Sequence, residues 1–218
     1  MAKILIFSVL AHSFFCITIA FGPIPLQDLC VADPTSSTRL NGLPCKDPAA
    51  VKADDFFFSG LHVPGNTKNP YGAALTSMTV AQVPGLNTLG LSLARLDLDP
   101  NGFVPPHSHP RATEILTVLQ GSLEVGFITS YPDNKHLSKV LNQGDAFVVP
   151  VGLLHYQRNV GKGNTVVLAA ENSQNAGINV VPKGIFGAKP AINSDYLARA
   201  FLLNKISWNS SRLSSRDD

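Results

Sequence analysis

Three histidines and one glutamate stand at spacings that could hold a metal ion. His107 and His109 are one residue apart, and on an extended strand such a pair points both imidazoles to the same side. Glu114 comes five residues after His109 and stands directly before an apolar run. His155 comes forty-one residues after Glu114, beside another strand-like segment. A lone His-x-His pair is more often a surface or packing feature than a pair of metal ligands. The prediction of a metal site therefore depends on the combined spacing of all four residues. Three neutral imidazoles and one carboxylate suit a borderline-hard divalent metal with open coordination positions.

The segments around these residues have the pattern of short β-strands. Leu89, Leu91 and Leu93 alternate, and Leu96 and Leu98 resume on the opposite parity, as if past a bulge. The remaining apolar segments are the alternating Leu123, Val125 and Phe127 and the runs 115–119, 146–149, 165–169 and 178–181. Turn-forming sequences rich in Gly, Asn, Asp and Pro separate them. Many short strands at close, regular spacing predict an all-β sandwich or barrel.

The C-terminal region has a helical pattern instead. Ser194 is the expected N-cap, and apolar residues then recur at steps of three and four from Leu197 to Ile206, which predicts one apolar helical face. Residues 207–218 are polar and are expected to form a flexible tail. That tail contains the sequon Asn209-Ser210-Ser211, which predicts glycosylation at Asn209 or an unmodified sequon in a loose segment.

The N-terminus indicates secretion. Residues 1–20 combine a basic residue, an apolar stretch from Ile4 to Ile19 and small residues at the end, as in a secretory signal peptide. A membrane anchor is the alternative, but the stretch is short for the ~20 apolar residues that a spanning helix needs. Removal of the signal would leave a soluble extracellular protein without a membrane segment. It would also leave only Cys30 and Cys45, which predicts a disulfide in a secreted chain. A redox or metal-binding pair would need a tighter spacing such as Cys-x-x-Cys.

Composition narrows the possible partners. The 218-residue chain has 17 Lys and Arg against 15 Asp and Glu, a net charge of +2, and only 15% charged residues. A soluble domain usually carries about 25% charged residues. The chain therefore has unusually little charge to spread over its surface. Nucleic acid is not expected as a partner, because phosphate binding needs a concentrated basic surface and no local run of Lys and Arg supplies one.

Two linked motifs resemble those of the cupin superfamily. The segment His107-Ser108-His109-Pro110-Arg111-Ala112-Thr113-Glu114, followed by Gly121, resembles the first cupin motif. The segment from Gly144 through Pro150-Val151-Gly152 and His155 to Asn159 resembles the second. Further short segments around the two motifs are similar to plant germin-like proteins. These segments include Leu26 to Asp33, Cys45-Lys46 and Asn172-Ser173-Gln174-Asn175. The resemblance covers residues from about 21 to 206.

The resemblance implies a fold, an assembly and a cofactor. The fold is a cupin β-jelly-roll barrel with a C-terminal helical segment, and dimers assemble as a trimer of dimers. Each barrel would bind one manganese ion through His107, His109, Glu114 and His155, and Cys30 would pair with Cys45. The expected division is a signal peptide at 1–20, an N-terminal extension with the disulfide at 21–57, the barrel and helices at 58–206, and the tail at 207–218. The expected location is the apoplast or cell wall.

Three positions depart from the germin pattern. Asn101 stands where the first motif opens with glycine, and Asn tolerates a left-handed backbone better than most residues. Ala94 and Val104 align with two asparagines that germins are thought to use in holding oxalate. Neither side chain can donate a hydrogen bond, so a site that grips a dicarboxylate through polar groups loses most of its discrimination. Oxalate oxidase activity is therefore not expected.

The remaining chemistry gives two main hypotheses. A divalent manganese ion with one glutamate and neutral histidines has a net charge near +1, which attracts a small anion such as superoxide. Superoxide dismutation is the leading hypothesis. The alternative is a non-catalytic extracellular binding or receptor-like module for a small carboxylate ligand, favoured by the apolar Ala94 and Val104. Hydrolysis of a sugar nucleotide is not supported, because no glycine-rich loop for phosphate is present.

Overall fold

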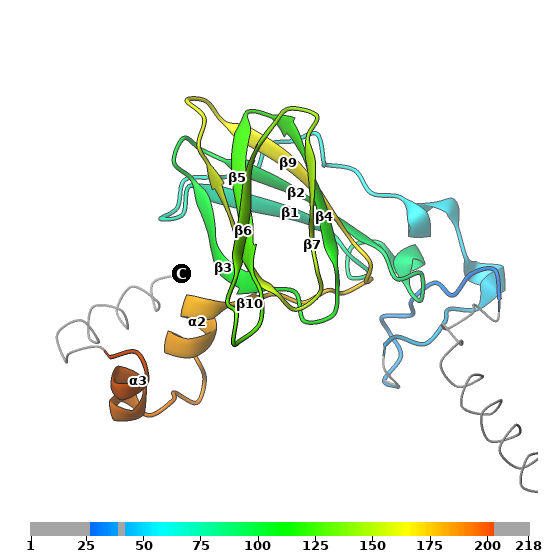
Figure 1. Cartoon of the computed structure of the whole chain (residues 1–218). Helices are drawn as coiled ribbons and strands as arrows, with labels where there is room; N and C mark the ends of the chain where they lie inside the picture. The colour runs from blue at the N-terminus through cyan, green and yellow to red at the C-terminus, as the bar shows by residue number, and fades with distance from the viewer. Residues whose placement is uncertain (1–26, 39–41, 203–218) are drawn as a thin grey trace, which may run out of the picture.

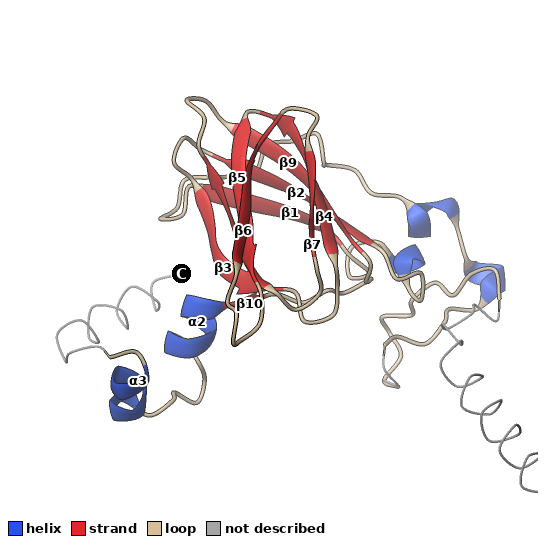
Figure 2. Cartoon of the chain, viewed as in Figure 1, coloured by secondary structure: helices blue, strands red, loops and turns tan. Residues whose placement is uncertain are grey.

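Ten strands in the described part of the chain form two antiparallel five-stranded sheets. The structure is a computed structural model that describes residues 27–38 and 42–202 (Figure 1). One sheet has the strand order β1-β2-β9-β4-β7 and the other β10-β3-β8-β5-β6. The strands are β1 (Ala73–Met78), β2 (Ser92–Leu98), β3 (Phe103–Ser108), β4 (Glu114–Gln120), β5 (Ser122–Ile128), β6 (His136–Asn142), β7 (Ala146–Val149), β8 (Leu154–Asn159), β9 (Thr165–Glu171) and β10 (Asn179–Val180). The predicted all-β class with a C-terminal helical segment is confirmed (Figure 2).

The core lies between the inner faces of the two sheets. Alternate residues are buried over 114–118 of β4 and 165–169 of β9, as expected for strands with one face toward a core. Leu98, Leu116 and Val167 project from one sheet and meet Leu123 and Val125 from the other. Each of these side chains is almost completely buried. Burial of a side chain of this size stabilises the fold by roughly 1.5–3 kcal/mol.

The prediction of a bulge between Leu93 and Leu96 is wrong. Strand β2 runs without interruption from Ser92 to Leu98, and its register is continuous with both neighbouring strands. The inward positions of β2 are Ser92, Ala94, Leu96 and Leu98, while Leu89 and Leu91 precede the strand and are exposed. Thr88 and Gly90 have positive φ, so the chain turns just before the strand. Leu93 lies on the opposite face of β2 from Leu96 and Leu98, so the change of parity is a change of face within one continuous strand.

The outer face of β2 is covered by an earlier segment of the chain. Arg95 forms an ion pair with Asp97 at 2.7 Å and donates a hydrogen bond to the carbonyl of Leu61. Asp97 also accepts a hydrogen bond from the backbone of Gly65. Burial raises the pKa of Asp97, but the bonds from Arg95 and Gly65 outweigh it and hold that pKa below its ordinary value. The pair therefore ties residues 61–65 to the barrel.

The C-terminal helices are shorter than expected. Helix α2 covers Val181–Phe186 and helix α3 covers Ser194–Ala200. The N-cap of α3 is Asn193 and not Ser194, because the Asn193 side chain accepts the hydrogen bond from the backbone of Tyr196. The run 178–181 contains β10 and the first residue of α2, so it is only partly a strand. Ile206, the tail 207–218 and Asn209 lie outside the described residues.

The predicted disulfide between Cys30 and Cys45 is confirmed. It fixes an N-terminal segment that includes the short 3-10 helices η1 (Pro48–Ala50) and η2 (Ala53–Phe56) and packs near η3 (Pro84–Leu86). Ala32 forms a bridge with Cys45, and its backbone donates to the carbonyl of Pro84. The buried Asn87 donates to the carbonyl of Leu43. The predicted signal peptide, residues 1–20, lies outside the described residues.

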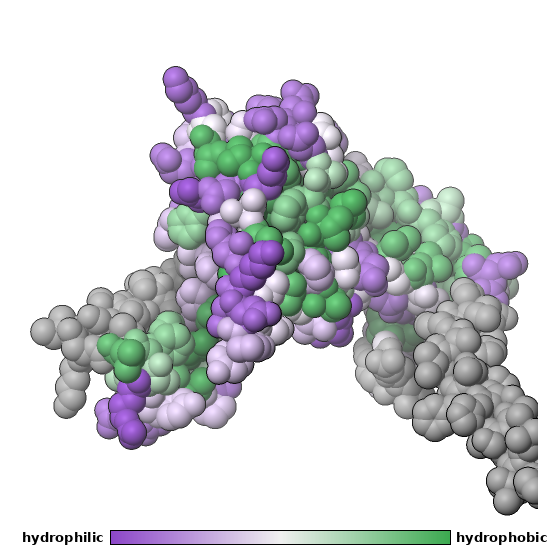
Figure 3. Space-filling model, viewed as in Figure 1, coloured by the Kyte–Doolittle hydropathy of each residue, from purple (hydrophilic) through white to green (hydrophobic). Residues whose placement is uncertain are grey.

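Several apolar side chains remain on the outside of the barrel. Ile115 and Val148 project from β4 and β7 and are each about half exposed. Ile115 and Val148 are opposite each other in adjacent strands, so they form one apolar area. Figure 3 shows apolar residues at the surface over the barrel and beside the C-terminal helices. Within the described ranges, no helix is long and apolar enough to cross a membrane.

Candidate metal centre

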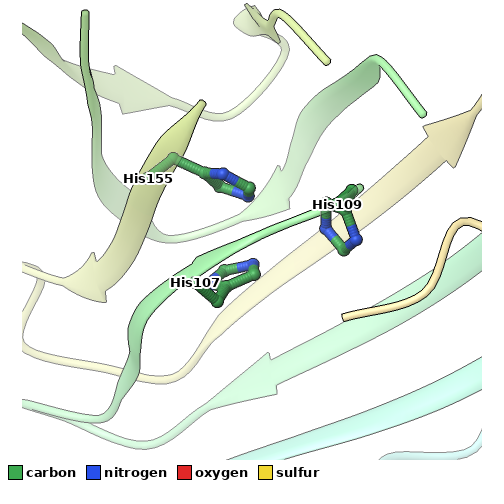
Figure 4. A group of neighbouring side chains, drawn as sticks. All are labelled: His107, His109 and His155. Carbon is green, nitrogen blue, oxygen red and sulfur yellow. The ribbon is translucent and has the colours of Figure 1, made fainter. Parts of the chain in front are cut away.

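The four candidate ligands converge at one end of the barrel interior. His107 lies in β3 and His155 in β8, where they are partners across the two strands. His109 follows β3, and Glu114 begins β4 in the opposite sheet. A register shift between Val104 and His107 contains two prolines, which cannot donate ladder hydrogen bonds. The bulge and the strand pairing bring the three imidazoles together (Figure 4).

The hydrogen bonds of the histidines fix their tautomers. The Nδ1 atom of each ring faces a backbone carbonyl oxygen: Pro105 at 2.9 Å for His107, Gly177 at 2.7 Å for His109 and Leu153 at 2.9 Å for His155. A carbonyl oxygen only accepts, so Nδ1 carries the proton in all three rings. The Nε2 lone pairs are left available for a metal. The three histidines offer ligand atoms within 4.8 Å of one another.

Glu114 completes this set from the other sheet. Its side chain is buried, and Oε2 lies 3.2 Å from Nε2 of His155 and 4.0 Å from Nε2 of His109. Glu114 Oε2 and His155 Nε2 have no hydrogen-bond partner, although both are fully enclosed. Two buried lone pairs at this distance repel each other unless a cation lies between them. The donor set therefore fits a bound divalent metal.

The surroundings favour the protonation states that metal binding requires. Burial and, after it, the neighbouring His155 imidazole lower the pKa of His107 to about 4. Burial raises the pKa of Glu114, but its interactions with His155 and the other two histidines outweigh burial and lower that pKa overall. Near neutral pH the site therefore holds a neutral His107 and an ionised Glu114. No proton has to leave either group before a metal binds.

Glu171 also belongs to this region, although neither sequence motif contains it. It is the last residue of β9 and the cross-strand partner of Glu114. Its Oε1 lies 3.3 Å from Nδ1 of His109, and Oε2 accepts a hydrogen bond of 2.7 Å from the hydroxyl of Ser92. His109, Glu114 and Glu171 also form a cluster able to hold a cation. Strand parity could have found it, because Glu171 stands on the inward side of a strand whose other inward residues are Thr165, Val167 and Ala169.

A cavity of about 400 Å³ opens beside the metal centre. Its polar end contains His107, His109, Glu114 and Glu171. Its wall is mainly apolar and includes Ala94, Leu96, Val104, Leu116 and Val167. The side chain of Gln157 also lines the cavity, and its Oε1 is buried without a hydrogen-bond partner. Ala94 and Val104 thus place methyl groups in the same cavity as the candidate ligands.

Two other polar residues of the motifs have structural roles. Asn159 donates hydrogen bonds to the carbonyls of Leu98, Asp99 and Gly163, so it fixes the turns at the far end of the barrel. Asn101 adopts a left-handed backbone with φ of 65°, which is the conformation that the substituted glycine position needs. Neither residue lines the cavity.

Arg111 braces the segment that supports His109. Its guanidinium donates to the carbonyl and side chain of Asn175. Gly177 has a left-handed φ of 69°, and a Cβ there would lie 2.6 Å from the Arg111 guanidinium. Glycine at this position therefore allows Arg111 to pack against the backbone whose carbonyl binds His109.

The two facing sheets and the enclosed histidine and glutamate cluster define a cupin barrel with a metal-binding site. The sequence model of the Cupin family matches residues 59–206, so the chain belongs to the cupin family. Within that family it is a germin-like protein. It is 58% identical to germin-like protein 2-3 of Oryza sativa subsp. japonica over 86% of this chain and 84% of that protein. It is 51% identical to germin-like protein subfamily 1 member 7 of Arabidopsis thaliana over 96% and 92% of the two chains.

A solved structure supports the same assignment. Recombinant oxalate oxidase in complex with glycolate superposes with a TM-score of 0.86 and is 42% identical. The match covers 89% of this chain and 98% of that chain. Agreement of this extent includes the barrel and the segments on both sides of it.

Proposed function

We propose that this protein is a secreted, manganese-dependent germin-like protein that dismutes superoxide and lacks oxalate oxidase activity. The observation that carries the proposal is the cluster of three Nε2 lone pairs and one carboxylate beside an apolar cavity wall. His107, His109, His155 and Glu114 would hold the ion. Manganese would supply one-electron chemistry between its divalent and trivalent states. The choice of manganese follows the family, because affinity alone would favour copper or zinc at a nitrogen and oxygen site.

The chain's own residues would prepare the site for a small anion. Three carbonyl bonds hold the imidazoles in one tautomer and orientation, and the low pKa of His107 keeps that ring unprotonated. One superoxide ion is oxidised to oxygen and a second is reduced to hydrogen peroxide with the uptake of two protons. Superoxide needs no side-chain cradle, so Ala94 and Val104 do not obstruct this reaction.

The same residues disfavour oxalate. Ala94 and Val104 line the cavity and have no polar side-chain atom to hold a second carboxylate. Glu171 also lines the cavity and adds a negative charge near His109. That charge acts on both anions, so the preference for superoxide over oxalate rests on the missing polar atoms at Ala94 and Val104.

A second candidate function is carriage of a small carboxylate ligand without catalysis. A cavity of about 400 Å³ is much larger than a diatomic anion requires, and it is within the usual range for ligand pockets. The apolar wall and the acceptor Oε1 of Gln157 favour a ligand with an apolar body and one polar group.

The deciding experiment is metal analysis of the mature protein purified without added metal, with parallel superoxide and oxalate assays. The proposal expects about one manganese per chain, superoxide removal above that of free manganese, and no hydrogen peroxide from oxalate. Stoichiometric manganese without dismutase activity would exclude the enzyme. Binding of a carboxylate that disappears in His155→Ala, with a redox-silent metal, would establish the carrier instead.

Location and assembly belong to the same proposal. The Cys30–Cys45 disulfide supports an oxidising compartment, so we place the mature protein in the apoplast. The exposed apolar residues Ile115 and Val148 support burial between subunits in a trimer of dimers. Light scattering of the purified protein should give the mass of six chains. A compact monomer at micromolar concentration would contradict this assembly.

A further inference from the structure

Glu171 stands in a row of three polar residues at the metal end of the barrel. Ser92 on β2 and Glu114 on β4 are its register partners on either side. Residues that are directly opposite in adjacent strands share one face of the sheet. Two carboxylates in this arrangement destabilise a sheet unless positive charge or a donor separates them. The imidazole of His109 lies between them, with Nε2 4.0 Å from Glu114 Oε2 and Nδ1 3.3 Å from Glu171 Oε1.

This arrangement makes His109 different from the other two histidines. The Nδ1 atoms of His107 and His155 face only the carbonyl of the residue two positions earlier. Nδ1 of His109 faces the carbonyl of Gly177, from a distant segment, and has a carboxylate beside it. A carboxylate near the N–H of a ligating imidazole increases the electron density at the other nitrogen. His109 is therefore expected to be the strongest donor of the three.

Ser92 holds Glu171 in this position. Its hydroxyl donates a bond of 2.7 Å to Oε2, which leaves Oε1 directed at His109. Both side chains are largely enclosed, since Ser92 is 5% exposed and the Glu171 side chain 13%. A short hydrogen bond from a buried hydroxyl to a carboxylate restricts its rotation. The arrangement is a chain from Ser92 through Glu171 to His109.

We propose that Glu171, held by Ser92, is a positioning residue that strengthens His109 as a metal ligand and stabilises the higher oxidation state of the bound metal. The inference rests on the proposed metal site, but it does not depend on which reaction the site performs. A negative charge behind His109 favours the trivalent over the divalent ion, because the attraction grows with the charge of the metal. It follows that Glu171 lowers the reduction potential of a one-electron couple at the site.

The test compares Glu171→Gln with the matched variant Glu124→Gln. Both remove one glutamate charge, but Glu124 lies on the outside of the barrel, where it binds Tyr156 and Arg158. Competition with a chelating dye measures manganese(II) affinity, and a mediated redox titration measures the potential. Loss of a partner behind a ligand typically weakens metal binding about 10- to 100-fold. Glu171→Gln should show such a loss and a more positive potential, while Glu124→Gln should match the wild type.

Two further variants separate positioning from charge and from folding. Glu171→Asp restores the charge and should recover part of both losses. Ser92→Ala keeps the Glu171 charge but frees its carboxylate, so it should weaken binding less than Glu171→Gln does and still raise the potential. In the cobalt(II)-loaded protein, the exchangeable Nδ1–H resonance of His109 should move in Ser92→Ala, while those of His107 and His155 stay in place.

The outcomes distinguish this inference from the proposed function. Equal affinity and potential in the wild type, Glu171→Gln and Ser92→Ala would overturn the role of Glu171, whatever the superoxide assay gives. A protein that binds manganese and shows the expected shifts but removes no superoxide would retain this inference and lose the proposed enzyme. A wild type that binds no divalent metal would overturn both.

Discussion

The two ends of the cavity are built on different principles. At the metal end each imidazole has a hydrogen-bond partner at Nδ1, and strand register determines which side chains meet. Along the wall, Ala94, Val104 and Leu116 contribute only apolar atoms, and no side-chain hydrogen bond fixes them. The metal end therefore determines what chemistry is possible, and the wall determines which molecule reaches it. Changes at one end should leave the property set by the other largely intact.

Removal of one ligand should have the largest effect. His155→Ala takes away a buried donor and leaves the Glu114 carboxylate enclosed beside a vacated position. We expect metal content to fall from about one ion per chain to near zero, measured by elemental analysis after dialysis. His62→Ala, at an exposed position, is the control and should keep its metal. Full metal occupancy in His155→Ala would show that the cluster is not the metal centre.

Polar groups added to the cavity wall should change which ligand the cavity binds. In the double variant Ala94→Asn and Val104→Asn, each amide can donate a hydrogen bond to a carboxylate. A hydrogen bond to a charged group contributes roughly 1.5–3 kcal/mol, or about 10- to 100-fold in affinity. Oxalate binding, measured by calorimetry on the metal-loaded protein, should strengthen accordingly. Thr76→Asn on the outward-facing side of β1 serves as the control. Unchanged oxalate affinity would mean that the wall does not control access.

The metal-free protein should lose stability as the pH falls. His107 has a pKa of about 4 in the folded protein and an ordinary value of 6.5 when unfolded. Between these values the unfolded chain takes up a proton that the folded His107 does not, so the stabilisation present above pH 6.5 is lost toward pH 4. The free energy of unfolding should fall by up to about 3 kcal/mol from this residue. Urea unfolding at several pH values measures it.

A variant isolates this contribution. His107→Gln removes the titrating group, so its stability should depend less steeply on pH than that of the wild type over the same interval. His62→Ala should retain the wild-type slope. Identical slopes for wild type and His107→Gln would show that burial does not hold His107 neutral.

An apolar change in the wall should have the smallest effect on the metal. Ala94→Val adds two methyl groups to the cavity without adding a polar atom. We expect manganese affinity to stay within about two-fold of the wild type, because no ligand or hydrogen bond changes. Binding of a carboxylate with an apolar body should weaken, because the cavity becomes smaller. A large loss of metal would show that the two ends are coupled.

The sequence predicted the metal cluster and the strands better than it predicted their neighbours. His107, His109, Glu114 and His155 lie at spacings that belong to a motif, so their convergence could be expected. Glu171 lies outside both motifs, and its closeness to Glu114 depends on the pairing of β4 with β9, which no local pattern specifies. The register between strands that are distant in the sequence cannot be predicted from a local sequence pattern.

Local errors have a similar cause. Leu89 and Leu91 continue the alternation of Leu93, but the positive φ at Thr88 and Gly90 delays the strand until Ser92. Asn193 and Ser194 are both good N-caps, and only the direction of the Asn193 side chain toward Tyr196 decides between them. The spacing at which hydrophobic residues repeat identifies a strand or helix reliably, but backbone geometry determines the residue at which the element begins.

The carbonyl of Gly177 sets a limit on how the protein can be shortened. The last long strand of the barrel ends at Glu171, and a designer of a minimal fragment would be inclined to stop there. Such a fragment would lose the carbonyl that orients His109 and the pairing of β10 with His107 and Ser108. The smallest fragment that retains the metal centre must therefore extend to Val180, and a fusion partner or protease site belongs beyond that residue.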